Sequence, residues 1–134
     1  MLDLIDHIGI ATPDLDSGSL PYLRMGLTPL RADEENPVFA SKLRVFQIGE
    51  SLIELVAPTS ANSPLTQSLE ARGPGLHHIA FRVEDIELAA NALLARGAKF
   101  LTPEPQQGRA GSRVVFLDPS WGAGTLIELV EHKP

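Results

Sequence analysis

Two glutamates stand in the middle of apolar runs, and the two runs are identical. The pentapeptide Leu-Ile-Glu-Leu-Val occurs at residues 52–56, with Glu54 at its centre, and again at residues 126–130, with Glu128 at its centre. A glutamate is almost never fully buried unless it is paired with a cation or bound to a metal. The two runs therefore indicate a duplicated unit whose two matching carboxylates are directed at a site.

A histidine precedes each glutamate at a similar distance. Residues 6–16 align without gaps with residues 77–87, and this alignment pairs His7 with His78 rather than with His77. The spacing from histidine to glutamate is 47 residues in the first half and 50 in the second. Two features in the same order with nearly equal spacing indicate that the chain contains two copies of one module.

Two imidazoles and two carboxylates in equivalent positions could hold a divalent metal ion. Nitrogen and oxygen ligands suit zinc, nickel, cobalt, manganese or iron, and the chain has no cysteine to supply a thiolate. With four protein ligands, an octahedral ion keeps two positions for water or for a chelating substrate. Such an ion would act as a Lewis acid, and a neighbouring carboxylate could move a proton at the adjacent carbon.

The alternation of side chains along a strand places both histidines on a face of small residues. His7 shares its face with a glycine and an alanine, and His78 shares its face with an alanine. The opposite faces carry bulky apolar residues, and His77 points to that side. This pattern predicts a site on one side of the sheet and a helix-packed core on the other, with a supporting or structural role for His77.

The sequence predicts an α+β protein in which each module runs strand–helix–strand–strand–strand. In module one (residues 1–74), a short or irregular helix should end near Met25, and residues 31–37 should form a polar loop. In module two (residues 75–134), a clear amphipathic helix should follow the first strand, and a short strand should follow at residues 99–101. A short helix opened by Ser-Pro and closed by glycine should precede the link between the modules.

Length and composition limit the classes of function. At 134 residues and 43% hydrophobic, the chain is too short for two ordinary domains, so we expect one domain over residues 1–134. The net charge of −6, without a basic cluster, argues against a nucleic-acid partner. No signal peptide or apolar run of membrane length is present, so we expect no membrane partner and a cytoplasmic location.

Four segments in order resemble the vicinal oxygen chelate superfamily (glyoxalases, bleomycin-resistance proteins and dioxygenases), and within it the methylmalonyl-CoA epimerases. They begin with Asp-His-Ile-Gly-Ile-Ala near the N-terminus and end with Gly-Thr-Leu-Ile-Glu-Leu near the C-terminus. The segments cover residues 6–11, 49–55, 75–81 with 83–86, and 124–129. The resemblance spans nearly the whole chain.

The resemblance implies a vicinal oxygen chelate fold, in which two tandem βαβββ modules form a curled mixed sheet around a metal ion. Carried over by position, the four metal-ligand positions of the family are filled by His7, Glu54, His78 and Glu128. The implied reaction is the epimerisation of an acyl-CoA thioester by α-proton abstraction through a metal-stabilised enediolate, with Glu128 and Glu54 as the acid–base pair. The implied cofactor is a divalent ion of cobalt, manganese, zinc or nickel, and the implied assembly is a homodimer.

Two other functions stay open at this point. A lactoylglutathione lyase of the glyoxalase I type uses a similar ligand set and the same enediolate chemistry on a glutathione adduct. A bleomycin-resistance-like protein would bind a small molecule without a metal, although such proteins typically lack the ligand set. An extradiol dioxygenase, with two histidines and one carboxylate on iron, fits less well because those chains are usually longer.

The chain also departs from the epimerase pattern. Some epimerases place an additional acid–base glutamate in the stretch that here spans residues 42–46, which contains no carboxylate. The phosphates of a coenzyme A ligand would have to meet scattered cations such as Lys99, Arg109 and Arg113, for each of which a solvated surface position is an equal alternative. We expect His132, near the C-terminus, to be solvated.

Overall fold

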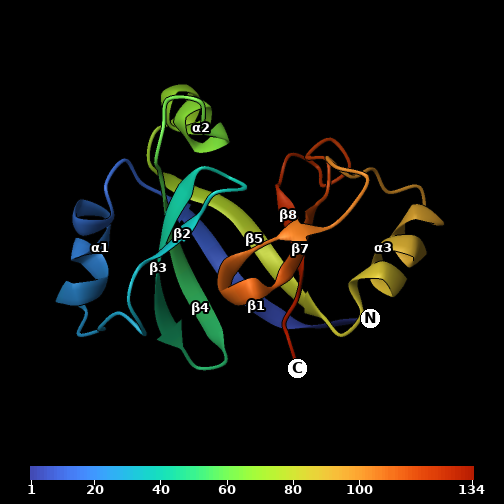
Figure 1. Ribbon diagram of the computed structural model, residues 1–134, viewed down its shortest axis with the longest axis horizontal. Helices are drawn as coiled ribbons and strands as arrows, with labels where there is room; N and C mark the ends of the chain where they lie inside the picture. Colours follow the sequence, from blue (N-terminus) through green and yellow to red (C-terminus); the bar gives the residue numbers. More distant parts are fainter. The chain divides into compact units, whose positions relative to one another are not determined.

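The computed structural model describes residues 1–134 and contains eight β-strands, three α-helices and one 3-10 turn (Figure 1). In chain order the elements are β1 (Leu2–Ala11), α1 (Leu15–Arg24), β2 (Glu34–Asn36), β3 (Ser41–Ile48), β4 (Ser51–Pro58), α2 (Pro64–Arg72), β5 (Gly75–Val83), α3 (Ile86–Leu94), β6 (Gln106–Gln107), η1 (Arg109–Gly111), β7 (Arg113–Phe116) and β8 (Ile127–Glu131). The predicted order of strand, helix and three strands therefore occurs twice, with α2 between the two copies.

The chain divides into two compact units, which are described separately. The His78 unit consists of Met1–His7 and His78–Pro134, and the Glu54 unit consists of Ile8–His77. The boundaries of the units differ from those of the two sequence modules. Each module begins with a strand, β1 or β5, and each of these strands has residues in both units. The single domain expected for residues 1–134 stays a prediction.

The strands form a mixed sheet whose hydrogen-bonded order is β2-β3-β4-β1 in one part and β1-β5-β8-β7-β6 in the other. The hairpin of β3 and β4 is antiparallel over its full length, from the pair Ser41 and Pro58 to the pair Ile48 and Ser51. Its turn contains Gly49 at φ +60, a conformation that favours glycine. By contrast, β5 and β8 are parallel.

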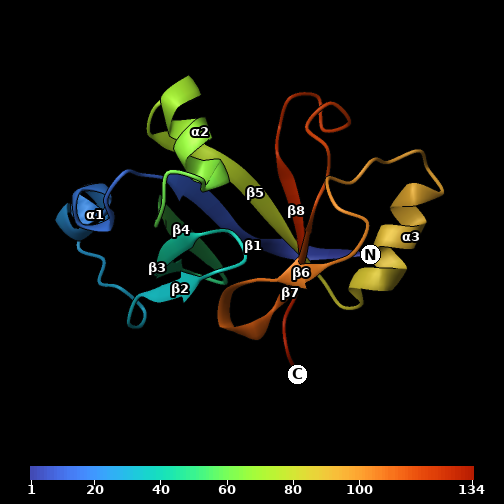
Figure 2. The ribbon, with the colours of Figure 1, turned by 45° about the horizontal axis from the view of Figure 1, so that its top comes forward.

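Two helices of the Glu54 unit contact opposite faces of β4, as the alternation of its side chains requires (Figure 2). Leu55 and Ala57 face α1, where Leu15 completes a buried cluster. Val56 faces the other way, toward Leu65 of α2. Glu54 shares the face of Val56, so the carboxylate lies on the side away from α1.

In the His78 unit, α3 packs against the sheet through a cluster of eight buried residues, which are Val83, Ile86, Ala89, Leu93, Ala98, Val115, Leu117 and Leu129. The start of α3 is capped twice. The Asp85 side chain accepts a hydrogen bond from Leu88 N, and Glu131 Oε2 accepts one from Ile86 N at 2.9 Å. Because Leu129 faces α3, its neighbour Glu128 lies on the opposite face, as the sequence predicts.

The predicted helices agree with the structure, whereas two predictions about short segments are wrong. The first helix ends at Arg24, next to the expected Met25. The loop expected at residues 31–37 contains β2, a three-residue edge strand paired with β3. The short strand expected near residue 100 is reduced to a single bridge between Phe100 and Leu117. No helix combines the length and apolar character that crossing a lipid bilayer demands.

Candidate metal centre

Three of the four predicted ligands come together within the His78 unit. Nε2 of His7 on β1 lies 3.1 Å from Nε2 of His78 on β5. Oε1 of Glu128 on β8 lies 2.9 Å from His7 Nε2 and 3.8 Å from His78 Nε2. The three residues are 2%, 7% and 5% exposed, respectively, so the cluster is nearly closed to water.

Strand register explains why Glu128 meets His78. The parallel pairing of β5 and β8 makes Ala80 the partner of Glu128. His78 and Ala80 share one face of β5, and the small side chain of Ala80 leaves room for the two larger ones. On the other side of β8, Phe116 of β7 is the partner of Glu128. The Phe116 ring lies edge-on to the His78 ring, with 5.5 Å between ring centroids, and this contact restricts the orientation of the imidazole.

The chemistry of the cluster fits a cation. Glu128 Oε1 is buried and accepts no hydrogen bond, although it lies close to two imidazole nitrogens. An unsatisfied buried carboxylate oxygen costs free energy that a bound positive ion would remove. The donor set of two nitrogens and one carboxylate oxygen suits a divalent ion of the first transition row. His7, His78 and Glu128 could therefore hold such an ion.

Behind His7 lies a second buried carboxylate, that of Asp6, which is 1% exposed. Its Oδ2 accepts hydrogen bonds from His7 Nδ1 at 2.7 Å and from an Arg109 guanidinium nitrogen at 3.2 Å. Its Oδ1 accepts hydrogen bonds from two Arg82 nitrogens at 3.1 and 3.0 Å and from His132 Nε2 at 2.6 Å. We call Asp6 with Arg82, Arg109 and His132 the Asp6 cluster.

The Asp6 cluster keeps its carboxylate ionised. Burial by itself would raise the pKa of Asp6, but the hydrogen bonds from His132 and His7 outweigh it and hold the pKa well below the usual range. The two guanidinium groups supply further positive charge next to the carboxylate. A negative charge is therefore fixed beside His7.

The sequence interpretation missed the Asp6 cluster and misjudged two of its members. His132, expected to be solvated, donates to Asp6 and its side chain is 29% exposed. Arg109, expected on a surface or at a phosphate, is 6% exposed and paired with Asp6. The available signal was Asp6 itself, a carboxylate directly before a candidate ligand in a strand whose neighbouring residues are apolar.

Glu54 belongs to the other compact unit and is buried there as well, with 6% of its surface exposed. It lies in the middle of β4, opposite Val45 of β3. His77, the residue that precedes His78, is half-buried at the end of the same unit. The two Leu-Ile-Glu-Leu-Val copies thus both bury their glutamates on the strand face away from α1 or α3.

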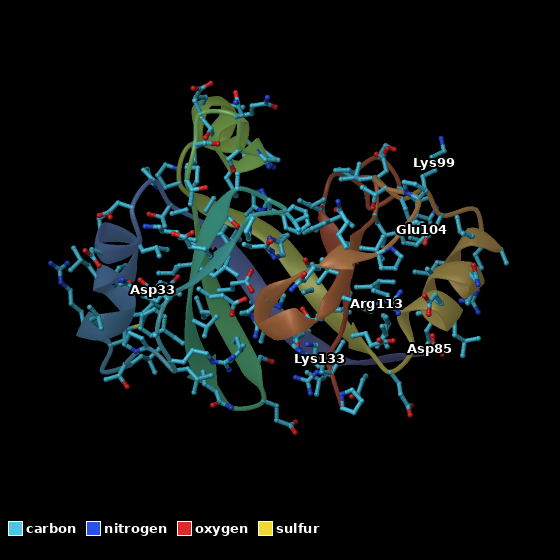
Figure 3. The ribbon with its side chains drawn as sticks, viewed as in Figure 1. Asp33, Asp85, Lys99, Glu104, Arg113 and Lys133 are labelled. Atoms are coloured by element: carbon cyan, nitrogen blue, oxygen red, sulfur yellow. The ribbon has the colours of Figure 1, made fainter.

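The remaining cations proposed for phosphate binding lie apart from the cluster. Arg113 pairs with Glu87 of α3 at 2.5 Å and with Glu131 at 3.7 Å. In Figure 3, Lys99 extends outward from the unit, and Arg113 lies toward α3. Arg113 is therefore engaged in ion pairs that support α3.

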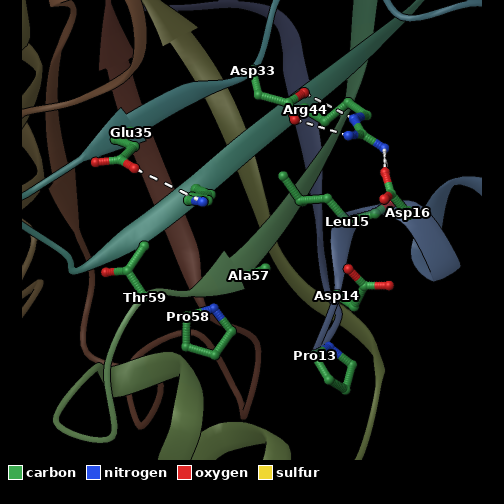
Figure 4. Close-up of a pocket in the computed structure, with 11 residues that line it drawn as sticks. Pro13, Asp14, Leu15, Asp16, Asp33, Glu35, Arg44, Ala57, Pro58 and Thr59 are labelled. Carbon is green, nitrogen blue, oxygen red and sulfur yellow. Dashed lines mark hydrogen bonds and ion pairs between the residues drawn. The ribbon is translucent and has the colours of Figure 1, made fainter.

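An open pocket of about 560 Å³ lies within the Glu54 unit, between α1 and the β2–β3 edge (Figure 4). Arg44 crosses it. The Arg44 guanidinium donates to both carboxylate oxygens of Asp33 at 2.8 Å, to the Leu15 carbonyl and to Ser19 Oγ. Arg44 also pairs with Asp16 of α1, so these contacts tie α1 to the sheet. The pocket contains none of the predicted ligands.

Comparisons with known proteins agree with this fold. The profile of the glyoxalase/bleomycin resistance protein/dioxygenase superfamily matches residues 6–116. An ethylmalonyl-CoA/methylmalonyl-CoA epimerase from Cereibacter sphaeroides is 33% identical over 131 residues, which are 96% of this chain and 98% of that protein. The chain therefore belongs to the glyoxalase/bleomycin resistance protein/dioxygenase superfamily.

Solved structures place the similarity further within that superfamily. A methylmalonyl-CoA epimerase from Mycobacterium tuberculosis superimposes with a TM-score of 0.94 at 31% identity, covering 99% of this chain and 90% of that one. A variant of the Streptomyces coelicolor methylmalonyl-CoA epimerase, in complex with 2-nitronate-propionyl-CoA, gives 0.94 at 34% identity over 100% of both chains. The predicted α+β class, the vicinal oxygen chelate fold and the resemblance to the epimerases are confirmed.

Proposed function

We propose that this protein is a divalent-metal-dependent epimerase of a malonyl-type acyl-CoA thioester, with methylmalonyl-CoA as the first substrate to test. The observation that carries the proposal is the convergence of His7, His78 and the unsatisfied Oε1 of Glu128 in a chain similar to methylmalonyl-CoA epimerases over its whole length. The relatives named above supply the substrate class.

We propose Glu54 as the fourth ligand. Its support is the duplication: Glu54 occupies in β4 the position that Glu128 occupies in β8, in identical local sequence and on the equivalent face. Glu54 is also buried to the same degree, and a buried carboxylate favours a cationic partner. With Glu54, the set would contain two imidazoles and two carboxylates.

In this proposal the residues of the chain divide the work. His7 and His78 would hold the ion through Nε2, and a bound divalent ion would supply Lewis-acid stabilisation of the negative charge that develops on the thioester oxygen. Glu128 takes the α-proton from the substrate at one of its carboxylate oxygens, and Glu54, which enters the turnover protonated, gives its proton to the opposite face of that carbon. Proton exchange with solvent restores both glutamates. Inversion requires two groups on opposite faces, and the two copies of the module supply one each.

Burial of the ligand set also favours this chemistry. A dry site strengthens the interaction of the carboxylates with a cation and excludes bulk water from the carbanion-like α-carbon. A metal-free binding protein would have no use for three buried, converging ligand atoms, so the bleomycin-resistance-like alternative has less support.

The test is proton exchange in heavy water. Protein stripped with a chelator and reloaded with cobalt, manganese, zinc or nickel is incubated with one diastereomer of methylmalonyl-CoA in D₂O. Deuterium at the α-carbon together with appearance of the other diastereomer is expected only in reloaded samples. Turnover of the methylglyoxal–glutathione adduct, without exchange into methylmalonyl-CoA, would establish the glyoxalase I alternative instead.

The assembly and the location stay predictions of the sequence. We propose a homodimer, which sedimentation equilibrium can test on the purified chain. Cytoplasmic location can be tested by fractionation of the source cells.

A further inference from the structure

Asp6 is a buried charge that the proposed chemistry leaves unexplained. It directly precedes a proposed ligand and receives hydrogen bonds from four side chains, two of which are arginines. Burying a carboxylate is costly, and the two arginines offset that cost by pairing with it.

The hydrogen bond between Asp6 and His7 determines where the proton of the imidazole lies. Both oxygens of Asp6 accept hydrogen bonds from arginines, so the carboxylate faces His7 as an acceptor, and the proton lies on His7 Nδ1, 2.7 Å from Asp6 Oδ2. In the neutral ring, this leaves the lone pair on Nε2. Nε2 is the atom that lies next to Glu128 Oε1 and His78 Nε2.

The repeat does not provide the same arrangement twice. In the alignment of the two modules, the position of Asp6 is taken by His77. The carboxylate therefore belongs to one half of the pseudo-symmetric ligand set, and it acts on His7 and not on the equivalent residue His78.

The donors to Asp6 come from separate parts of the His78 unit. Arg82 is on β5, Arg109 is in η1, and His132 follows the end of β8. Because each of these segments donates to the same carboxylate, its position relative to His7 is fixed from several sides.

We propose that Asp6 is a positioning residue that holds His7 with its proton on Nδ1 and its Nε2 lone pair directed at the metal position, and that Arg82, Arg109 and His132 hold Asp6 in turn. This inference rests on the proposed function, in which His7 binds the ion. It assigns no contact between Asp6 and the substrate.

The first test needs no variant and no metal. In ¹⁵N-labelled, metal-free wild-type protein at alkaline pH, where the imidazoles are neutral, long-range ¹H–¹⁵N correlation spectra report the tautomer of each histidine. We expect His7 to show a protonated Nδ1 and a pyridine-like Nε2. A protonated Nε2, or an even mixture of tautomers, overturns the inference whatever the catalytic activity.

The second test measures metal affinity directly. Zinc is titrated against a chromophoric chelator in the wild type, Asp6→Asn and the control Asp85→Asn. Asp6→Asn is expected to weaken zinc binding by roughly 10–100-fold, the usual effect of losing a carboxylate partner of a histidine ligand. Asp85→Asn makes the same change at the exposed cap of α3 in the same unit and should leave the affinity unchanged.

These outcomes separate the inference from the proposed function. Equal losses in Asp6→Asn and Asp85→Asn, or an unchanged zinc affinity in Asp6→Asn, would overturn the positioning role. If the wild type binds no metal at all, the proposed function fails, whereas the tautomer of His7 is still decided by the first test. That spectrum also decides the inference if Asp6→Asn does not fold.

Discussion

The two copies of Leu-Ile-Glu-Leu-Val have the same sequence and similar burial, but they belong to different compact units. Glu128 lies in the compact unit that contains both His7 and His78, with its Oε1 2.9 Å from one imidazole. Glu54 lies in the unit that contains neither of them. The difference arises because Met1–His7, the start of β1, belongs with the second half of the chain. Identical sequence thus produces an equivalent strand face in both units, whereas the neighbouring strands differ, since β4 pairs with β3 and β8 pairs with β5 and β7.

The largest expected effect comes from the two glutamates themselves. Glu128→Gln should lower kcat on methylmalonyl-CoA by roughly 10²–10⁴-fold, the contribution of a positioned acid–base group. Glu54→Gln should lower the rate of epimerisation as strongly, because an amide cannot return a proton, but it should keep α-proton exchange of the diastereomer on which Glu128 acts. Steady-state kinetics and exchange in D₂O of the metal-loaded variants measure both, with Glu50→Gln in the exposed turn as the control. Loss of that exchange in Glu54→Gln as well would show that the two glutamates do not divide the two proton transfers between them.

Metal binding should raise the free energy of unfolding, and this gain should depend on Glu128. At a free ion concentration about 1,000 times Kd, a ligand bound only by the native state adds about 4.1 kcal/mol to the free energy of unfolding. Urea unfolding of chelator-treated and zinc-loaded protein measures this gain, which Glu128→Gln should largely remove. An unchanged gain in that variant would contradict its place among the ligands.

The apolar neighbours of the glutamates allow a matched comparison of the two cores. Leu55 and Leu129 occupy the same position of the pentapeptide and are 0% and 1% exposed. Replacing either by alanine should lower the free energy of unfolding by about 3 kcal/mol, within the usual range for buried leucines. Leu129→Ala should cost more, since its cluster holds eight buried residues and that of Leu55 holds four. Chemical denaturation of both variants decides the order, and a larger loss in Leu55→Ala would reverse the comparison.

The smallest effect concerns an ion pair confined to the Glu54 unit. The hydrogen bond from Arg44 lowers the pKa of Asp33 from its usual value of 3.8. A carboxyl with a lowered folded-state pKa contributes stability above its unfolded pKa, and this contribution is lost as the pH falls through the folded pKa. Asp33→Asn should therefore destabilise the protein by less than about 1 kcal/mol at neutral pH. The variant should also lose less stability than the wild type on acidification below pH 4. Thermal melts across this pH range can check this difference. Melting temperatures that fall equally with pH in both proteins would contradict the prediction.

The features that could be predicted from the sequence are those that depend on residues close together in the chain. The alternation of His7 with small residues, the repeat of Glu54 and Glu128 and the caps of α2 each follow from residues close together in the chain. These signals gave the correct strand faces and the correct pairing of His78 rather than His77 with His7.

What could not be predicted depends on contacts between distant segments. His132 lies 126 residues from Asp6, and Arg109 lies 103 residues from it. Without knowledge of its partner, a polar residue near the C-terminus such as His132 is expected to be exposed to solvent, because most polar and charged residues are exposed. The strand β2 was missed for a similar reason, since its polar residues pair only with the edge of β3 and show no apolar alternation.

The membership of Met1–His7 in the His78 unit has a consequence for synthesis of the protein. The proposed ligands His7 and Glu128 lie on β1 and β8, so a nascent chain in which β8 has not yet formed cannot bring both to an ion. Chains emerge N-terminus first, and contacts between distant segments form late. Metal capture through both residues would then be possible only after β8 has left the ribosome, and the ion would stabilise only chains that contain both segments.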